Sequence, residues 1–190
     1  MKRFRRRRER GMRHLLVAAL LAAVPACSFP ALAQAGPAEP SVPGKIAVGS
    51  GHKLFLVTHA TGVQIYSCNA TAGGYAWGLV APRAELYGTN GKLIGTHFAG
   101  PTWQARDGSS VVGQRVDGVT VDADAIPWLL LSAASTSAGS DGDRFAGTTY
   151  IQRLATTGGI APPAGDCNAD TAGDRAEIPY TADYYFWKAN

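Results

Sequence analysis

The chain has 190 residues, with 18 Lys or Arg and 14 Asp or Glu, so its formal net charge is +4. Residues 1–35 hold eight of the basic residues and one of the acidic residues, which leaves 10 basic and 13 acidic residues and a net charge of −3 beyond them. A mildly acidic chain without a cluster of Lys or Arg argues against nucleic acid as a partner, because nucleic-acid binding depends on basic contacts to phosphates.

The first 35 residues have the three parts of a secretory signal peptide. Residues 1–13 are basic, residues 15–24 are almost wholly apolar, and small residues follow at 31–33 and 33–35 in the Ala-x-Ala pattern of a cleavage site. The apolar run is about half of the roughly 20 residues that a membrane span needs, so we expect no permanent transmembrane anchor. The pattern predicts a signal peptide over residues 1–35 and a secreted or periplasmic protein.

Three details of this leader stay open. Met12 is an alternative start to Met1, because the two residues after Met12 already supply a short basic beginning. The residues before Cys27 resemble a lipoprotein processing box, although Pro25 fits such a box poorly. Lipidation at Cys27 is therefore a minor alternative to a soluble exported protein. The cleavage site itself is not decided by the sequence.

The rest of the chain divides into a linker and one domain. Residues 36–44 are rich in Pro and Gly, which predicts an extended linker. Residues 45–190 have one composition throughout and a length that suits a single β domain. They contain short runs of β-branched and aromatic residues between turn residues, and no window of helical periodicity. We expect strands at 53–57, 63–68, 75–80, 83–87, 92–96, 103–106, 110–116, 126–131, 148–155 and 180–187.

Turn chemistry and burial patterns indicate how these strands associate. Asn90-Gly91 and Asp107-Gly108 are strong hairpin signals and are expected to join the strands on either side of them. The apolar run 126–131 does not alternate, as expected of a strand that is buried on both faces. These features predict an all-β, mainly antiparallel fold, with a β-sandwich as the preferred architecture and a small β-barrel as the alternative.

The cysteines support an exported protein. Cys27 leaves with the leader if cleavage occurs at the Ala-x-Ala sites, so Cys68 and Cys167 remain. Two cysteines in an exported chain usually form one disulfide, and two buried thiols are the alternative. Closing a loop of this length stabilises a fold by about 4–5 kcal/mol in the chain-entropy model.

The segment around residues 97–109 holds the best candidates for a site. His97, Trp103, Asp107 and Ser109 lie on both sides of a Gly-Pro corner and would meet if the corner folds the strands back. A His97–Asp107 pair with Ser109 nearby would serve acid–base or nucleophilic catalysis in a hydrolase. The simpler interpretation is architectural: the polar groups bond to turn backbone, and Trp103 belongs to the core. No nucleophile-elbow motif supports the hydrolase.

No metal or cofactor motif is complete. The histidines beyond the leader are His52, His59 and His97, and their spacing matches no zinc motif. Residues 49–54 form an incomplete dinucleotide fingerprint that precedes a strand, whereas the true fingerprint follows one. We therefore expect neither a metal nor a cofactor.

Aromatic residues on the predicted strands suggest a ligand-binding face, since their rings have an apolar face and, in Tyr and Trp, a polar tip. About half of them should be core residues on alternating strands. With His97 and Asp107, the ligand-binding candidates are Trp103, Tyr66 and Trp77. The other aromatic residues of this set are Tyr75, Tyr184, Tyr185 and Trp187.

A set of segments carries a family resemblance: GVQIYSC (62–68), the region of Trp77 and Pro82, GTHFAGPTW (95–103), DGS (107–109), IPWLLL (126–131), IQRLATTGG (151–159), APPAGDC (161–167) and PYTADYYFW (179–187). Together they resemble the domain of unknown function 3455 (DUF3455) family, an exported domain, over roughly residues 45–188. The resemblance brings no catalytic residues with it. It implies that Cys68 and Cys167 both lie inside family motifs, which agrees with a disulfide.

The leading functional hypothesis is a secreted or periplasmic, non-enzymatic β domain. It would bind an envelope or extracellular ligand, for example a glycan, or be structural. The alternative hypothesis is the hydrolase that uses His97 and Asp107.

Overall fold

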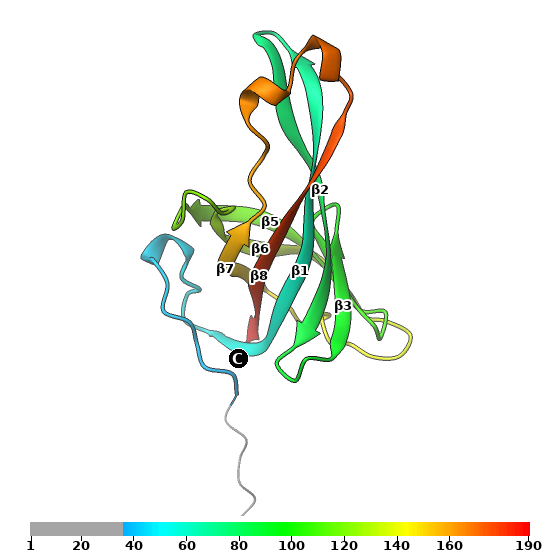
Figure 1. Cartoon of the computed structure of the whole chain (residues 1–190). Helices are drawn as coiled ribbons and strands as arrows, with labels where there is room; N and C mark the ends of the chain where they lie inside the picture. Colours follow the sequence, from blue (N-terminus) through cyan, green and yellow to red (C-terminus); the bar gives the residue numbers. More distant parts are fainter. Residues whose placement is uncertain (1–35) are drawn as a thin grey trace, which may run out of the picture. The chain divides into compact units, whose positions relative to one another are not determined.

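The computed structural model describes residues 36–190, which contain eight β-strands and three short 3-10 helices (Figure 1). The strands are β1 (His52–Thr71), β2 (Gly74–Gly88), β3 (Leu93–Phe98), β4 (Thr102–Ala105), β5 (Ser110–Val119), β6 (Trp128–Ser137), β7 (Tyr150–Gly158) and β8 (Arg175–Ala189). The 3-10 helices are η1 (Gly44–Ile46), η2 (Ala164–Asp166) and η3 (Ala169–Thr171). No helix in this part of the chain is long and apolar enough to cross a membrane.

All eight strands belong to one antiparallel sheet, in which each strand pairs with the next one along the chain. β8 also pairs with β1, from His52 opposite Ala189 to Ser67 opposite Arg175, so the strand order closes on itself as a barrel. The prediction of an all-β, antiparallel fold is confirmed. The closing pair agrees with the small barrel that was the alternative, because a sandwich consists of two separate sheets.

β1 and β2 are each continuous, whereas the sequence suggested two shorter strands in place of each. Residues 58–62 were expected to interrupt the first strand, but they pair with β2 on one side and β8 on the other. Pro82 was expected to break the second strand. It lies opposite Gln64, next to a β-bulge in which Val80 is the extra residue. A bulge tolerates the missing N–H of proline, so the pairing continues through it.

The two predicted hairpin turns are confirmed. Asn90-Gly91 joins β2 to β3, and Gly91 has the positive φ of 73° that favours glycine at such a turn. Asp107-Gly108 joins β4 to β5, where the Ala105 N–H donates to the carbonyl of Ser109 at 2.9 Å. These turns set the register of β3, β4 and β5, the strands that carry the central candidate residues.

Successive side chains along a strand point to opposite faces of the sheet, and each face has its own hydrophobic core. Tyr184 and Phe186 of β8 point into the main core inside the closed sheet, whereas Tyr185 packs on a second core outside it. Ile46 of η1 is fully buried in this second core, against Leu130 and Leu154. β6 therefore has a core on both faces, as its apolar run predicted.

A hydrogen-bonded network accompanies this second core. The Gln152 side-chain amide donates from Nε2 to the carbonyl of Ile46 at 2.6 Å. The Trp187 indole N–H donates to Oε1 of the same amide at 2.9 Å. Gln152 is 1 % exposed and Trp187 is 5 % exposed. Both side chains therefore have their buried nitrogen atoms paired, and they fix the segment before β1 to β7 and β8.

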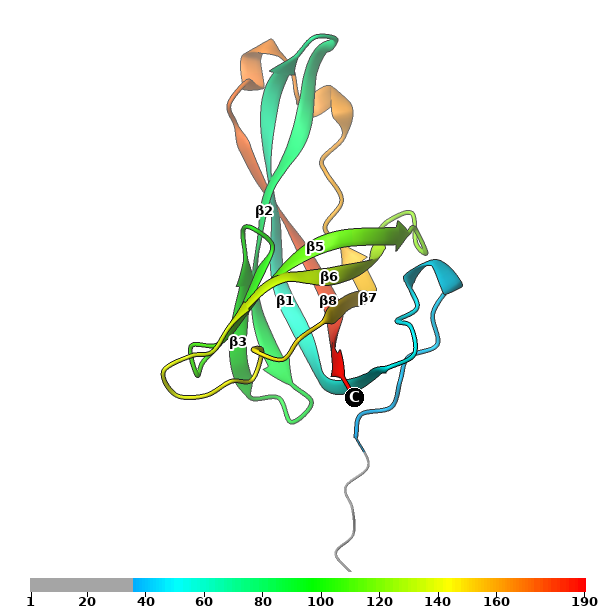
Figure 2. The ribbon, with the colours of Figure 1, turned by 180° about the vertical axis from the view of Figure 1, so that it is seen from behind.

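β1, β2 and the start of β8 extend past the rest of the sheet as a projecting arm (Figures 1 and 2). We define the arm as residues 66–71, 74–79 and 160–176, and the remainder of the sheet as the body. A disulfide joins Cys68 of β1 to Cys167, which follows η2, with their Cα atoms 5.3 Å apart. The predicted Cys68–Cys167 bridge is confirmed, and it holds the β1–β2 hairpin against the segment that leads into β8.

Candidate functional site

An aromatic cluster forms where β3 and β4 meet inside the body. The strand register places His97 directly opposite Trp103, and their rings stack with centroids 4.2 Å apart. Gly113 of β5 leaves room for the indole, because a Cβ atom there would lie 2.9 Å from the Trp103 ring. Tyr184 packs edge-on against both rings, with centroids 5.1 Å from His97 and 5.2 Å from Trp103. The predicted strand–corner–strand unit thus brings His97 and Trp103 together.

His97 is a buried, neutral imidazole. Its side chain is 3 % exposed, and its Nδ1–H donates to the carbonyl of Thr102 at 2.8 Å. Burial lowers the pKa of His97 from 6.5 to about 3, the Thr102 carbonyl opposes this shift, and the positive charge of Arg153 adds to it. Because Nδ1 holds the proton, Nε2 carries the lone pair of the ring.

A cavity of about 270 Å³ lies beside this cluster. All eight strands contribute to its wall, so it belongs to the interior of the body rather than to one surface loop. Its volume is close to the lower end of the range for small-molecule sites. Its lining is mostly apolar and contains neither Asp nor Glu. The lining residues are Gln64, Leu79, Val80, Ala81, Pro82, His97, Gly100, Pro101, Trp103, Arg115, Leu129, Leu131, Arg153 and Tyr184.

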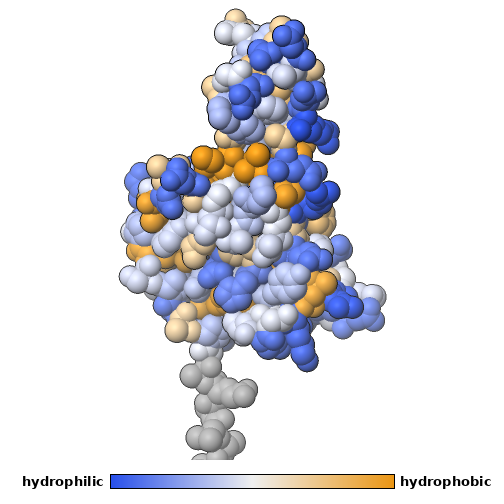
Figure 3. Space-filling model, viewed as in Figure 1, coloured by the Kyte–Doolittle hydropathy of each residue, from blue (hydrophilic) through white to orange (hydrophobic). Residues whose placement is uncertain are grey.

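The cavity has an apolar rim next to the base of the arm. Leu79 is 59 % exposed and Val80 is 46 % exposed, and both residues line the cavity. Figure 3 shows apolar surface gathered where the arm meets the body. The bulge at Val80 turns β2 at this point, between the part paired within the arm and the part paired within the body. The apolar lining of the cavity therefore continues onto the exposed surface at Leu79 and Val80.

Two donors in the cavity wall have no hydrogen-bond partner among residues 36–190. They are Nε2 of the Gln64 amide and Nε1 of the Trp103 indole. Gln64 is 2 % exposed and Trp103 is 1 % exposed, so bulk water does not satisfy them. A buried polar group without a partner costs about 1–3 kcal/mol, which proteins usually avoid. Both groups belong to side chains that line the cavity.

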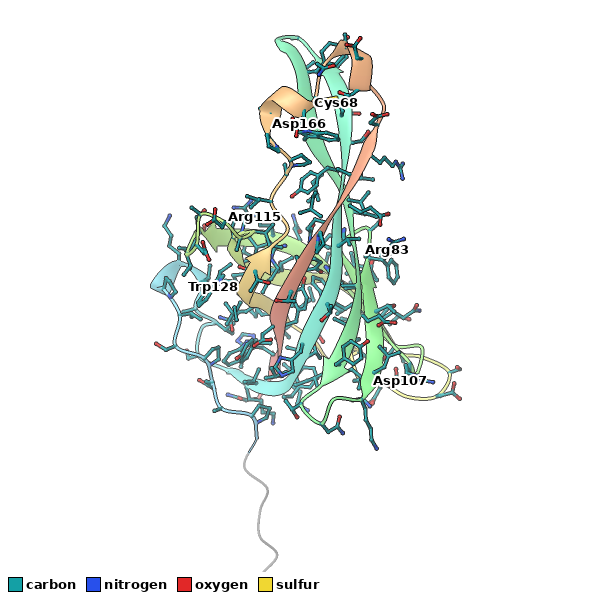
Figure 4. All side chains as sticks on the ribbon, in the orientation of Figure 1. Cys68, Arg83, Asp107, Arg115, Trp128 and Asp166 are labelled. Atoms are coloured by element: carbon teal, nitrogen blue, oxygen red, sulfur yellow. A yellow bond between two sulfur atoms is a disulfide. The ribbon has the colours of Figure 1, made fainter. Side chains whose placement is uncertain are left out.

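Two arginine side chains add positive charge to the wall. Arg153 of β7 is half-buried, and its Nε and Nη2 donate to the carbonyl of Pro127 at 3.1 and 2.8 Å. Arg115 of β5 is exposed and lies near the base of the arm (Figure 4). Burial raises the pKa of Tyr184, and the charge of Arg153 opposes that rise. The charge of Arg153 therefore acts on both His97 and Tyr184, which line the same cavity.

Asp107 and Ser109 lie apart from the cavity. Oδ1 of Asp107 accepts from the Ser109 hydroxyl at 2.6 Å and from its N–H at 2.9 Å, and Oδ2 accepts from the N–H of Arg144 at 3.1 Å. These bonds, the Ser109 hydroxyl first, lower the pKa of the Asp107 carboxyl. The Ser109 hydroxyl accepts in turn from the N–H of Phe145 at 3.1 Å. Asp107 and Ser109 thus attach the loop before β7 to the β4–β5 turn.

The acid–base pair of the hydrolase hypothesis does not form in these contacts. The hydrogen bond of His97 goes to Thr102, and those of Asp107 go to Ser109 and Arg144. Figure 4 shows Asp107 at the end of the body away from the arm. The contacts match the architectural interpretation, in which both side chains bond to backbone at their turns. No observation at His97, Asp107 and Ser109 favours catalysis.

The other two ligand-binding candidates lie near the arm. Tyr66 is buried and donates from its hydroxyl to the carbonyl of Gly159 at 2.6 Å, which connects β1 to the end of β7. Trp77 lies opposite Cys68 in the β1–β2 pairing, within the arm. Neither Tyr66 nor Trp77 lines the cavity. Of the five ligand-binding candidates, the structure brings together His97 and Trp103.

The described residues contain no group of three or more His, Cys, Asp or Glu side chains that could hold a metal ion. His59 pairs with Asp183 at 2.6 Å on the outside of the sheet. His52 packs edge-on against Tyr150, with ring centroids 4.9 Å apart.

Sequence reasoning missed Gln64, Arg115 and Arg153 as site residues, although two of them carried a signal. Arg153 lies two positions after Ile151 in the expected strand 148–155, so both residues share one face, and Ile151 is a fully buried member of the main core. Gln64 is buried on the same face of β1 as Tyr66, two positions further along the strand. At a core-facing position of a strand the pattern calls for an apolar residue. A charged or amide side chain there departs from that pattern, and here both departures are at residues that line the cavity.

The fold is a disulfide-linked, closed antiparallel β domain with an internal cavity. The chain belongs to the DUF3455 family, described as proteins of unknown function, whose sequence model matches residues 49–188. The predicted resemblance is confirmed over nearly the whole of the described sheet. The chain matches no curated protein and no solved structure.

Proposed function

We propose that this protein is an exported, non-enzymatic binding domain that holds a small, largely apolar molecule in the cavity of the body. The observation that carries the proposal is the pair of unpaired donors, Gln64 Nε2 and Trp103 Nε1, in the wall of an otherwise apolar cavity. A ligand that accepts hydrogen bonds would relieve the cost of both buried groups on binding.

The position of the aromatic side chains favours a small molecule over a glycan chain. A glycan would stack on exposed rings, but Trp103 and Tyr184 are 1 % and 0 % exposed. Their rings pack on one another and on His97, so they offer no exposed ring face on which a glycan could stack. Leu79 and Val80 supply an apolar entrance, which suits a compact apolar ligand.

The sequence supports the proposal of export, and residues 1–35 lie outside the described part of the chain. The signal-peptide pattern supports secretion or a periplasmic location, and the Cys68–Cys167 bridge suits an oxidising compartment. Mass spectrometry of the protein from its host would find a mature chain that begins after one of the Ala-x-Ala sites. A lipid-modified chain that begins at Cys27 would contradict this location.

The binding proposal can be tested with N-phenyl-1-naphthylamine, a neutral apolar dye whose fluorescence rises in apolar sites. We expect saturable binding by the unaltered protein. Ala81→Trp would place a large side chain in the cavity wall and should weaken dye binding at least about ten-fold. Ala81 is only half-buried, so the body can accept this change without loss of its core.

The matched control is Ala76→Trp, an exposed position on the same strand, within the arm. This variant should bind the dye as the unaltered protein does, and thermal unfolding would verify that both variants fold. Equal dye binding by the two variants, or no binding by the unaltered protein, would contradict the proposal.

A further inference from the structure

The cavity wall has positive charge and no negative charge of its own. Arg153 and Arg115 line it, and no Asp or Glu does. Within residues 36–190 the ion pairs are His59–Asp183 and Arg83–Glu177, so neither cavity arginine has a carboxylate partner there. A half-buried guanidinium is normally paired with an anion, because removing its charge from water is costly without one.

The polar contacts of Arg153 leave part of its guanidinium unused. Nε and Nη2 share one acceptor, the carbonyl of Pro127, and the guanidinium also donates to the Tyr184 hydroxyl. A guanidinium has five N–H donors, so this side chain retains donors beyond these contacts. Arg153 shares the core-facing side of β7 with Ile151, and its charge lowers the pKa of His97 across the cavity. Arg153 also lines the cavity, so its charge acts on the space that a ligand would occupy.

The remaining lining restricts the kind of anion. Gln64 Nε2 and Trp103 Nε1 are donors without partners on two side chains that line the cavity. Leu129, Leu131 and the rim residues Leu79 and Val80 require an apolar body. A cavity of about 270 Å³ has room for one small molecule of this type.

From this arrangement we infer that the ligand is a small apolar carboxylic acid, bound as its carboxylate. The carboxylate would lie against the guanidinium of Arg153, with Gln64 and Trp103 as further donors and Arg115 at the entrance. Its apolar part would fill the space toward Leu79 and Val80. The inference rests on the proposed binding function and adds the chemical class of the ligand. Arg is suited to this role because its planar fork matches the two oxygens of a carboxylate.

The test compares three probes with the same apolar body: 4-phenylbutyrate, 4-phenylbutanol and 4-phenylbutylamine. Each is titrated against the dye-loaded protein, so that displacement reports its affinity for the cavity. We expect the carboxylate to bind at least about ten-fold more tightly than the alcohol, and the amine to bind most weakly. The preference for the carboxylate should fall as salt is added, because Arg115 is exposed to solvent and its charge is screened.

Variants locate the charge that is responsible. Arg153→Gln should reduce the affinity for 4-phenylbutyrate about ten-fold or more and leave the dye and the alcohol nearly unaffected. Arg115→Gln should have a smaller effect of the same kind. Because Arg115 is exposed, this variant keeps the test decisive if Arg153→Gln does not fold. The control is Arg83→Gln, an exposed arginine of β2 that pairs with Glu177 and does not line the cavity.

The outcomes separate the two proposals. If the dye and the alcohol bind but the carboxylate has no advantage, the binding proposal stands and the inference about the carboxylate is overturned. A carboxylate preference that survives both Arg153→Gln and Arg115→Gln would also overturn it. If neither the dye nor any of the three probes binds, the proposed function fails, and the inference fails with it.

Discussion

Two regions of the molecule each bury one glutamine and one tryptophan, but they treat the polar atoms of these residues differently. Outside the sheet, Gln152 donates to the carbonyl of Ile46 and accepts from the indole of Trp187. Inside the sheet, Gln64 Nε2 and Trp103 Nε1 have no partner among the described residues. The residue types and the degree of burial are the same, so the difference lies in the surroundings.

The outer pair is complete because the segment before β1 folds back over β7 and β8 and supplies the backbone carbonyl of Ile46. The inner pair faces a cavity instead of a second segment of chain. A complete network stabilises the fold, whereas an incomplete one lowers its stability until a partner binds. Gln152 and Trp187 therefore have an architectural role, whereas the unpaired donors of Gln64 and Trp103 are consistent with the proposed binding role.

The largest expected effect is a pH dependence of the unfolding free energy, and it comes from His97, which stacks on Trp103 inside the sheet. The pKa of buried His97 is about 3 in the folded protein and 6.5 in the unfolded chain, so the unfolded chain takes up this proton first as the pH falls. The free energy of unfolding should therefore fall by about 3 kcal/mol between pH 7 and pH 4 because of this group. Above the unfolded pKa of 6.5 the group is neutral in both states, so it causes no further change of stability with pH. Urea unfolding at the two pH values measures this loss.

The control for the pH effect is His97→Gln, which removes the titrating group and keeps an amide donor for the Thr102 carbonyl. Its stability at pH 7 should be lower, but it should lose less stability on acidification than the unaltered protein does. An equal loss in both proteins would show that His97 is not responsible.

Replacing each of the two glutamines with methionine tests the comparison directly. Gln152→Met should destabilise the fold by about 2 kcal/mol, because the buried N–H of Trp187 and the carbonyl of Ile46 lose their partner. Gln64→Met, a change of the same size and shape, should alter stability by less than about 1 kcal/mol, because it removes a donor that had no partner. Thermal unfolding of both variants without ligand provides the measurement. Similar losses in the two variants would contradict the comparison.

The smallest effect is expected from the tryptophans. Trp187→Phe and Trp103→Phe both remove an indole N–H and leave a similar cavity, but only the first leaves Gln152 without its donor. We therefore expect Trp187→Phe to cost about 1 kcal/mol more than Trp103→Phe in urea unfolding. In the dye and carboxylate titrations the order should be reversed, with Trp103→Phe the more damaging change. If the same variant showed the larger loss in both stability and ligand binding, the two tryptophans would not have different roles, and the comparison would be contradicted.

Much of the fold was predictable because its signals are local. The turns at Asn90-Gly91 and Asp107-Gly108 depend on a few adjacent residues, and the double burial of the apolar run in β6 is visible as a lack of alternation. The Cys68–Cys167 bridge followed from there being two cysteines after the leader. The continuity of β1 and β2 was not predictable, because residues 58–62 are held in a strand by pairing with distant partners.

The cavity could be predicted only in part. His97 and Trp103 were found because the corner between them is short and brings one strand back onto the next. Gln64 and Arg153 are 89 positions apart and line one cavity only because the sheet closes between β8 and β1. A local pattern contains no information on that closure. The local pattern does show where a polar residue occupies a core-facing position of a strand, and Gln64 and Arg153 are both such residues.

The bridge between Cys68 and Cys167 also determines how the protein responds to a protease. These residues are 99 positions apart, and the covalent ring that they close contains β2 to β7. The mostly exposed loop at residues 138–144 is inside that ring, between β6 and β7. One cleavage there produces two fragments, each with one of the two cysteines. The fragments migrate together in electrophoresis until a reducing agent is added, so a nicked molecule keeps both halves of its sheet at high effective concentration.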